Sequence, residues 1–259
     1  MNFKLNDTVT RKSHHNDIIF RIISINGNIA KLVGVNVRLI ADSLIEDLVM
    51  NNDVDNDDTD IIRRSLEDTP KDRENYFYIP GKILHIDGDD YYLERCMKFY
   101  ESMGVKANGI SISEDNISSK VLDLVKEYRP DIIVITGHDA YYSKKNDKFD
   151  ISNYQNSKNF VSAVKELRKY EKNQDKLIII AGACQSDYEE LIKAGANFAS
   201  SPRRINIHAL DPAVIASSIA FSDKNKSIDL LNLIDKTKYG SDGIGGIITN
   251  GTMYVGYPR

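Results

Sequence analysis

Short apolar runs alternate with amphipathic segments over the last two-thirds of the chain. Most of the runs are rich in isoleucine, as strands buried on both faces are. Between the runs, apolar residues recur every three or four positions, which is the spacing of one helix face. The predicted strands lie at residues 82–87, 107–112, 131–136, 177–181 and 197–200, and the predicted helices at 89–103, 118–128, 156–170, 186–194, 211–221 and 227–236.

Alternating strands and helices predict an α/β domain over residues 79–259, with an open, mostly parallel sheet and helices on both faces. Residues 139–155 are polar and predict a long loop after the third strand. At the C-terminus, Asn250-Gly251 separates two apolar segments, so residues 246–255 are predicted to form a hairpin.

Several residues mark the ends of the predicted helices. Gly104 follows the first helix as a C-terminal stop. Ser186 begins a capping box that ends at Glu189. Asp211 precedes Pro212 and is expected to be an N-cap.

The first part of the chain has a different pattern. Residues 1–50 contain three short strand-like runs, and Asn26-Gly27-Asn28 is a turn between two of them. A module this small predicts an SH3-like or similar half-barrel, whose core is marginal by itself at under ~50 residues. The three runs lie at residues 7–11, 18–25 and 29–33.

Residues 51–78 are predicted to be an acidic, flexible linker. Between residues 51 and 75, nine acidic side chains outnumber four basic ones. The run that starts at Asp53 resembles a calcium-binding loop, but Asp58 occupies the position that requires glycine. Arg64 stands where the bidentate glutamate belongs, so the segment is interpreted as solvated chain.

The bulk composition limits the function classes. Net charge is −4, which gives no basic footprint for nucleic acid or anionic lipid. No apolar run approaches the length of a membrane span, and the N-terminus lacks the apolar core of a signal peptide. Two cysteines are too few for a disulfide framework or a cysteine-rich zinc site. We therefore expect an intracellular protein with no metal, no cofactor and no membrane or nucleic-acid partner.

Two neighbouring predicted strands each end in a residue that can do chemistry. The third strand leads into Gly137-His138, and the fourth leads into Ala183-Cys184. Catalytic groups of open α/β sheets gather beyond the carboxyl ends of the strands, and adjacent strands are about 4.8 Å apart. The sequence thus predicts a thiol–imidazole pair at this edge.

Local features would assist such a pair. A free thiol has a pKa near ~8.5, and a nearby helix N-terminus or protonated His138 would raise its thiolate fraction. Small residues leave room for a substrate backbone, and N–H groups at Cys184 and after His138 could hold an oxyanion. The residues expected around the pair, for oxyanion or substrate binding, are Gly137, Asp139, Gln185, Asp211 and His208.

Other chemically capable residues have simpler interpretations. Cys96 shares a helix face with Leu93, which favours core packing. His85 alternates within the first strand and is expected to be a core or edge residue. His14-His15 lies in a loop and is expected to face solvent.

Two resemblances follow from these residues. The His138–Cys184 arrangement resembles the caspase-like clan of cysteine peptidases, where the histidine lies about 50 residues upstream of an Ala-Cys strand end. Here the separation is 46 residues. The clan's His-Gly order is replaced by Gly137-His138-Asp139, so the oxyanion donor after the histidine comes from a residue with a side chain.

The second resemblance covers nearly the whole chain, which is similar to the YabG family of sporulation-specific proteases. The motifs are Asp7-Thr-Val-Thr-Arg-Lys-Ser13, Val37-Arg-Leu-Ile-Ala-Asp42, Leu84-His-Ile-Asp-Gly-Asp89, Ile135-Thr-Gly-His-Asp-Ala140, Ala181-Gly-Ala-Cys-Gln-Ser186, Gly195-Ala-Asn-Phe-Ala-Ser-Ser-Pro202, Asn206-Ile-His-Ala-Leu-Asp-Pro212 and Asp242-Gly-Ile-Gly-Gly246.

This resemblance implies a mother-cell endopeptidase that trims spore coat and related proteins late in sporulation. It also implies that Cys184 is the nucleophile, that His138 is its base, and that cleavage follows basic residues. A basic preference requires an acidic pocket, for which Asp139, Asp211 and Asp242 are the candidates. Arg63-Arg64 in the linker is then a candidate self-cleavage site.

A different class of function also fits the fold. A receiver-like or flavodoxin-like binding or scaffold module would explain the acids that follow the first strand, namely Asp87, Asp89 and Asp90. A receiver needs an acceptor aspartate at the end of the third strand, where His138 and Asp139 stand instead. This alternative gives Cys184 no role.

Overall fold

The computed structural model describes residues 3–51, 58–67, 77–142 and 147–256. The chain divides into two compact units, Met1–Thr59 and Asp60–Arg259. No helix in these described ranges is both long and apolar enough to pass through a lipid bilayer.

The N-terminal unit is a five-stranded antiparallel sheet with the order β4-β3-β2-β1-β5. Its apolar cluster contains Val9, Phe20, Leu32 and Leu48. The Gly27-Asn28 turn joins β2 to β3 as predicted, and Gly27 has the positive φ of 60° that such a turn requires. The strands are β1 (Thr8–Arg11), β2 (Phe20–Asn26), β3 (Ile29–Gly34), β4 (Ile40–Leu44) and β5 (Leu48–Met50).

The predicted linker contains regular structure in its described part. Residues 58–67 form helix α1 (Asp58–Glu67), and β6 (Phe77–Ile79) pairs with β13 (Tyr254–Gly256). Ile61 is buried and belongs to the same apolar cluster as Phe99 and Met103. The charged composition of this segment predicted solvated chain, because Ile61 is the buried residue of α1 and most of its neighbours are polar. The remainder of the predicted linker lies outside the described residues.

The C-terminal unit is built on a six-stranded sheet with the order β12-β11-β10-β9-β7-β8. Five strands are parallel, and only β12 runs antiparallel to its neighbour. If the five parallel strands are numbered in chain order, they lie across the sheet in the order 2-1-3-4-5, which is a doubly wound arrangement. They are β7 (Ile83–Asp87), β8 (Ala107–Ser111), β9 (Ile132–Thr136), β10 (Ile178–Ala181) and β11 (Phe198–Ser200), followed by β12 (Ile244–Gly246).

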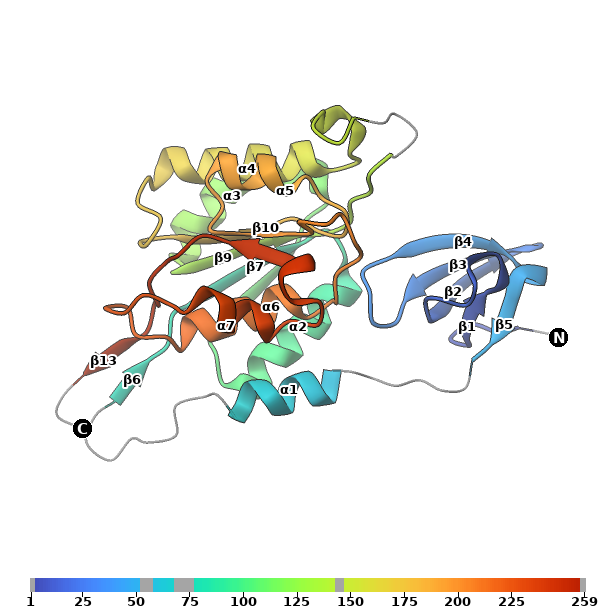
Figure 1. Cartoon of the computed structure of the whole chain (residues 1–259), viewed down its shortest axis with the longest axis horizontal. Coiled ribbons are helices and arrows are strands. Elements are labelled where there is room, and N and C mark those ends of the chain that lie inside the picture. The colour runs from blue at the N-terminus through green and yellow to red at the C-terminus, as the bar shows by residue number, and fades with distance from the viewer. Residues whose placement is uncertain (1–2, 52–57, 68–76, 143–146, 257–259) are drawn as a thin grey trace. The chain divides into compact units, whose positions relative to one another are not determined.

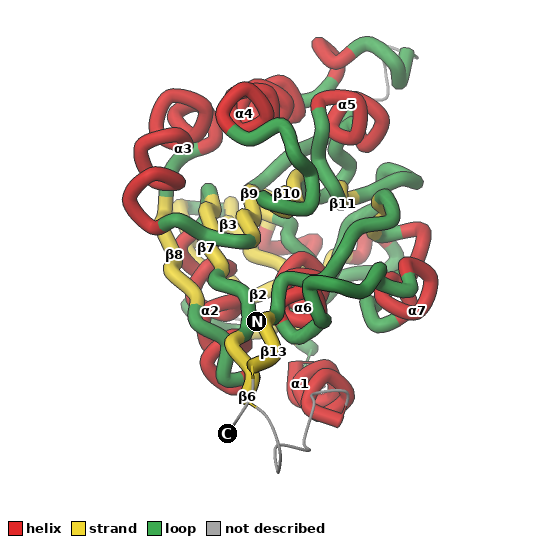
Figure 2. Tube along the Cα trace, turned by 90° about the vertical axis from the view of Figure 1, so that its left-hand side faces the viewer, coloured by secondary structure: helices red, strands yellow, loops and turns green. Residues whose placement is uncertain are grey.

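Helices cover both faces of this sheet, as predicted. Figure 2 views the strands nearly end-on, with α3, α4 and α5 on one side and α2, α6 and α7 on the other. Two separate apolar clusters fill the two sides, and the central strands contribute alternate residues to each. The helices are α2 (Asp90–Met103), α3 (Glu114–Tyr128), α4 (Ser157–Tyr170), α5 (Tyr188–Ala194), α6 (Asp211–Ala220) and α7 (Leu230–Asp235).

Three local predictions are corrected by the structure. The predicted C-terminal hairpin does not form, because β12 pairs with β11 while β13 pairs with β6 (Figure 1). Asp187, rather than Ser186, caps α5 by accepting from Glu190 N–H. Asp211 is the first residue of α6 and Leu210 is the N-cap, because the Asp211 carboxylate binds other loops.

The packing of α1 can be tested by truncating its buried residue. Replacing Ile61 with alanine removes apolar contacts with α2, so the free energy of unfolding should fall by about 2 kcal/mol. The matched control is Leu66→Ala, because Leu66 lies on the same helix and is 39% exposed. Urea denaturation of both variants measures the difference. Equal midpoints would mean that α1 does not pack on the C-terminal unit.

Candidate functional site

The strand order changes direction between β7 and β9, and this switch point is where doubly wound sheets form their sites. The parallel register aligns Asp87 with Thr136 and Ile135 with Ala181. Asp89 and His138 each lie two residues after the pair Asp87–Thr136. His138 and Cys184 each lie three residues after the pair Ile135–Ala181. Asp89, His138 and Cys184 therefore stand at the same level beyond β7, β9 and β10.

Three hydrogen bonds and one aromatic contact fix the position of His138. Its Nε2 is 2.8 Å from Oδ2 of Asp89, and its backbone N–H donates to Oε1 of Glu114 at 2.7 Å. Its carbonyl accepts from the Asn156 side chain at 2.8 Å. The ring meets Tyr92 edge to face at 5.8 Å. The imidazole is 21% exposed, so it remains accessible while its orientation is fixed.

Two glycines make room for the Glu114 carboxylate. A Cβ on Gly88 would lie 2.3 Å from Oε1 of Glu114, and a Cβ on Gly137 would lie 2.4 Å from the same oxygen. Gly137 therefore allows the His138 N–H to be held by Glu114. This explains the Gly-His order that differs from the caspase-like pattern.

Asp89 has two separate tasks. Its Oδ1 caps α2 by accepting from the N–H groups of Tyr91 at 2.9 Å and Tyr92 at 3.2 Å. Its Oδ2 binds His138. Partial burial would raise the pKa of the Asp89 carboxyl, but the hydrogen bond and charge of His138 outweigh burial, and the net effect lowers it. Asp89 is therefore ionised at neutral pH.

Asp139 joins the histidine loop to the cysteine loop. Its Oδ2 accepts from Ser157 Oγ at 2.5 Å and from Ser186 Oγ at 2.8 Å. Its Oδ1 accepts from the backbone N–H groups of Ala140 and Asn156. Burial raises the pKa of Asp139, although these four hydrogen bonds counteract the rise. All of its acceptor positions thus face protein donors, and none faces a substrate.

Cys184 is 1% exposed. Its Sγ accepts a hydrogen bond from the Ile207 N–H at 3.3 Å and lies 3.9 Å from the Ile207 carbonyl oxygen. Ile207 belongs to the segment between β11 and α6. This segment, residues 205–208, covers the thiol.

Gln185 connects the same segment to the cysteine loop. Its backbone has a positive φ of 58°. Its N–H donates to the Ile205 carbonyl at 3.0 Å, and its side chain reaches both Asn206 Oδ1 and the Tyr141 N–H. The Gln185 N–H is consequently occupied by the protein. Residues 205–208 and the cysteine loop form one hydrogen-bonded layer.

Asp211 and His208 lie together in the interior, both fully buried. The Asp211 carboxylate accepts from the backbone N–H groups of His208 at 3.1 Å and Lys238 at 2.9 Å. Burial raises the pKa of Asp211 to about 7 despite these hydrogen bonds. Its carboxylate anchors the start of α6 to the loop after α7.

The third acidic candidate, Asp242, is exposed. Its carboxylate is 3.4 Å from Arg203 Nε, and its carbonyl accepts from the Arg203 N–H. Both Arg203 and the neighbouring Ser201 belong to the loop that contacts Gln185. Asp242 is therefore the candidate whose carboxylate faces solvent beside the cysteine loop.

A second charged cluster was not anticipated from the sequence. Arg204 binds Glu189 at 2.5 Å and donates to the Tyr154 hydroxyl at 2.7 Å, while Asp187 is 3.8 Å away. Burial raises the pKa of Tyr154 to about 12, although its hydrogen bond with Arg204 counteracts the rise. This cluster fixes the loop after β11 against the start of α5.

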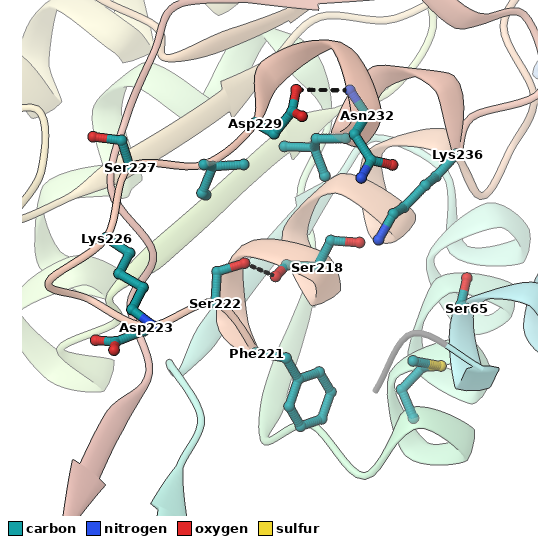
Figure 3. Close-up of a pocket in the computed structure, with 13 residues that line it drawn as sticks. Ser65, Ser218, Phe221, Ser222, Asp223, Lys226, Ser227, Asp229, Asn232 and Lys236 are labelled. Atoms are coloured by element: carbon teal, nitrogen blue, oxygen red, sulfur yellow. Dashed lines mark hydrogen bonds between the residues drawn. The ribbon is translucent and has the colours of Figure 1, made fainter. Parts of the chain in front are cut away.

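Figure 3 shows a pocket of about 370 Å³ between the C-terminal end of α6 and helix α7 with the residues before it. Ser222, Asp223, Asn232 and Lys236 are among its lining residues. The residues expected at the site do not line it. The pocket lies beyond the amino ends of the parallel strands, because α6 runs opposite to them.

Asp139 links the histidine loop to the cysteine loop through Ser186, Gln185 binds the segment that covers Cys184, and Asp211 and His208 are buried, His208 as the last residue of that segment. Asp89 was noticed in the sequence only as part of the alternative function. Glu114, Asn156 and Ser186 were missed, because each is an ordinary polar residue near the start of a helix. Position is what could have identified them, because each lies at or next to the start of a helix at the carboxyl edge of the sheet.

Two comparisons with known proteins bear on this arrangement. A family model described as YabG peptidase U57 matches residues 4–67 and 54–258. The sporulation-specific protease YabG of Bacillus subtilis (strain 168) is 42% identical over 286 aligned positions, which cover 100% of this chain and 99% of that protein. The similarity spans both units.

The buried Asp211 should make stability depend on pH. Because its folded pKa is raised to about 7 from 3.8, folding favours its protonated form, and that stabilisation is lost as pH rises through 7. Between pH 5 and pH 8 the loss should be roughly 2–3 kcal/mol. The Asp211→Asn variant removes this titration, so its unfolding free energy should vary less over the same range.

Urea denaturation of wild type and Asp211→Asn at pH 5, 6.5 and 8 measures the difference in slope. The variant's lost hydrogen bond lowers stability equally at all three values. Parallel pH dependences would show that Asp211 does not titrate in this window.

Proposed function

The chain belongs to the YabG peptidase family, and on that premise we propose that it is a cysteine endopeptidase with Cys184 as nucleophile and His138 as general base. Family membership makes it a sporulation protease, and a protease acts on protein substrates. The observation that supports the cysteine assignment is the register of β9 and β10, which pairs Ile135 with Ala181, three residues before His138 and Cys184 respectively. The caspase-like resemblance of these strand ends supports the same assignment.

The chemistry has two stages. His138 removes the proton from the Cys184 thiol, and the thiolate attacks the carbonyl carbon of the scissile bond. The protonated imidazole then gives this proton to the leaving amine, and an acyl-enzyme remains. Water, deprotonated by His138, attacks the thioester and releases the second product and the thiol.

The backbone around the pair supports oxyanion binding. Among the described residues, the N–H of Asp139, which follows His138, donates to no protein acceptor. The Gln185 N–H is occupied by Ile205 and is a poor candidate. The Asp139 N–H can therefore stabilise the tetrahedral oxyanion while its carboxylate holds the loops.

Attack requires the thiol to become accessible. The Sγ is bound to the Ile207 N–H in the structure, so residues 205–208 must shift, or the thiol must rotate, when substrate enters. Most of the hydrogen bonds between this segment and the cysteine loop use the backbone groups of Ile205 and Ile207. A substrate backbone in an extended conformation can replace these hydrogen bonds one for one.

For the basic preference, we favour Asp242 as the acidic residue. Asp139 and Asp211 have both oxygens engaged by hydrogen bonds, whereas the side chain of Asp242 is 63% exposed. The substrates would be spore coat and other sporulation proteins, cleaved in the mother-cell cytoplasm or at the coat surface. Arg63-Arg64 lies within α1, so self-cleavage there requires that helix to unwind.

The binding-module alternative is weaker on two observations. Asp89 is occupied by His138 and by the start of α2. Within the described residues, no three His, Cys, Asp or Glu side chains are grouped as they would be around a metal ion. This alternative also leaves Cys184 without a role.

The nucleophile can be tested with a matched pair of cysteine variants. Cys184→Ala should reduce cleavage of sporulation-stage extract by at least about 10³-fold, because no other group can form the acyl-enzyme. Cys96→Ala removes the other buried cysteine, which packs in the core beside Ala209, and should stay within about twofold of wild type. The cleavage activity of His138→Ala should be reduced by a similar factor to that of Cys184→Ala.

The readout is the set of new termini identified by mass spectrometry. Full activity in Cys184→Ala would reject the cysteine mechanism, whereas no cleavage by the wild type would favour the binding-module alternative.

The same termini test the basic preference. Lysine or arginine should precede most cleaved bonds, and Asp242→Asn should raise KM for a peptide with arginine at that position by roughly tenfold, since one ion pair is lost. Unchanged kcat is expected, because Asp242 does not contact the reacting atoms. Termini without enrichment of basic residues would contradict the preference, and an unchanged KM would exclude Asp242.

A further inference from the structure

The Asp89–His138 contact is more specific than helix capping requires. An N-cap needs one side-chain oxygen, which serine, threonine or asparagine supplies as well as aspartate. Here Oδ1 alone accepts both helix N–H groups, while Oδ2 is 2.8 Å from His138 Nε2. The second oxygen serves the imidazole.

The surroundings make this contact rigid. The backbone of Asp89 is fixed because its N–H donates to Oδ1 of Asp87 at 3.0 Å, and Asp87 is fully buried at the end of β7. On the other side, Glu114 and Asn156 hold the backbone of His138. Both partners are thus positioned independently of the hydrogen bond between them.

The hydrogen bond determines which imidazole nitrogen is basic. An ionised carboxylate can only accept, so Nε2 of a neutral His138 must carry the hydrogen. The lone pair is then on Nδ1, on the other side of the ring. Cys184 follows the end of β10, which pairs with β9 on the side away from β7. Asp89, His138 and Cys184 therefore follow one another along the carboxyl edge.

We propose that Asp89 is a positioning residue of the Cys184–His138 pair, which holds His138 in its Nε2–H form and presents Nδ1 to the thiol. This inference rests on the proposed cysteine peptidase function. When the thiol transfers its proton to Nδ1, the S–H bond breaks, an N–H bond forms, and the imidazolium gains a charge that the Asp89 carboxylate stabilises. The Nδ1 proton then passes to the leaving amine, and the ring returns to its starting form.

Asparagine at position 89 separates positioning from capping. Asp89→Asn keeps the shape and an oxygen for the cap, but its amide donates to Nε2 and so forces the hydrogen onto Nδ1. The matched control is Asp90→Asn, which removes the same charge from the same helix terminus at an exposed position. Asp89→Ser is a second control, since it caps the helix but does not reach His138.

The experiment measures kcat and KM of the full-length variants against pH, using a peptide found among the cleavage products. Asp89→Asn should lower kcat on the order of 10²–10⁴-fold, as expected when the tautomer is wrong, with little change in KM. Asp89→Ser should also lose activity, although less, and Asp90→Asn should match wild type.

Nitrogen NMR of labelled His138 reads the tautomer directly, without any need for activity. The proposal expects hydrogen on Nε2 in wild type and on Nδ1 in Asp89→Asn, with thermal unfolding of both within a few degrees. Hydrogen on Nδ1 in wild type would overturn it, as would activity in Asp89→Asn within twofold of wild type. If Cys184→Ala remains active while the tautomer is as expected, the cysteine mechanism fails, and only the effect of Asp89 on the His138 tautomer stands.

Discussion

A parallel sheet covered on both faces has room for polar chemistry only at the ends of its strands. Each central strand contributes alternate apolar side chains to the two apolar clusters, where an unpaired polar group would cost several kcal/mol. His85 and Asp87 on β7 are exceptions: His85, in the middle of the strand, has its Nδ1 2.8 Å from the Tyr100 hydroxyl, and Asp87 ends the strand. This constraint moves the chemistry to the loops, and the parallel register decides which loop residues meet.

Loops have no ladder to satisfy their N–H groups, and here buried carboxylates take that role. Glu114 holds the N–H of His138, Asp139 holds two N–H groups of its own loop, and Asp211 holds two from separate loops. Each carboxylate replaces what would otherwise be orphaned donors at a sheet edge. These hydrogen bonds hold the loops to the ends of the sheet.

Much of this could be predicted from the sequence, because strand and helix periods are local signals. The strand ends at His138 and Cys184 followed from apolar runs, and adjacency of the two strands followed from the doubly wound order. The pairing of Asp89 with His138 could not, since 49 residues separate them and Asp89 looks like any helix cap. The expected C-terminal hairpin failed for the same reason, because both of its strands pair with distant partners. Helix α1 was hidden by composition, which records charge but not which face carries it.

The position of Ile207 against Cys184 has a consequence for the lifetime of the enzyme. A thiol that is easily deprotonated is also easily oxidised, first to the sulfenic acid and then to products that cannot be reduced again. With 1% of Cys184 exposed, peroxide reaches the sulfur only when the backbone over it moves aside. Under the proposed cysteine mechanism, the backbone that must move before a substrate can reach the thiol also limits oxidation of that thiol between catalytic cycles.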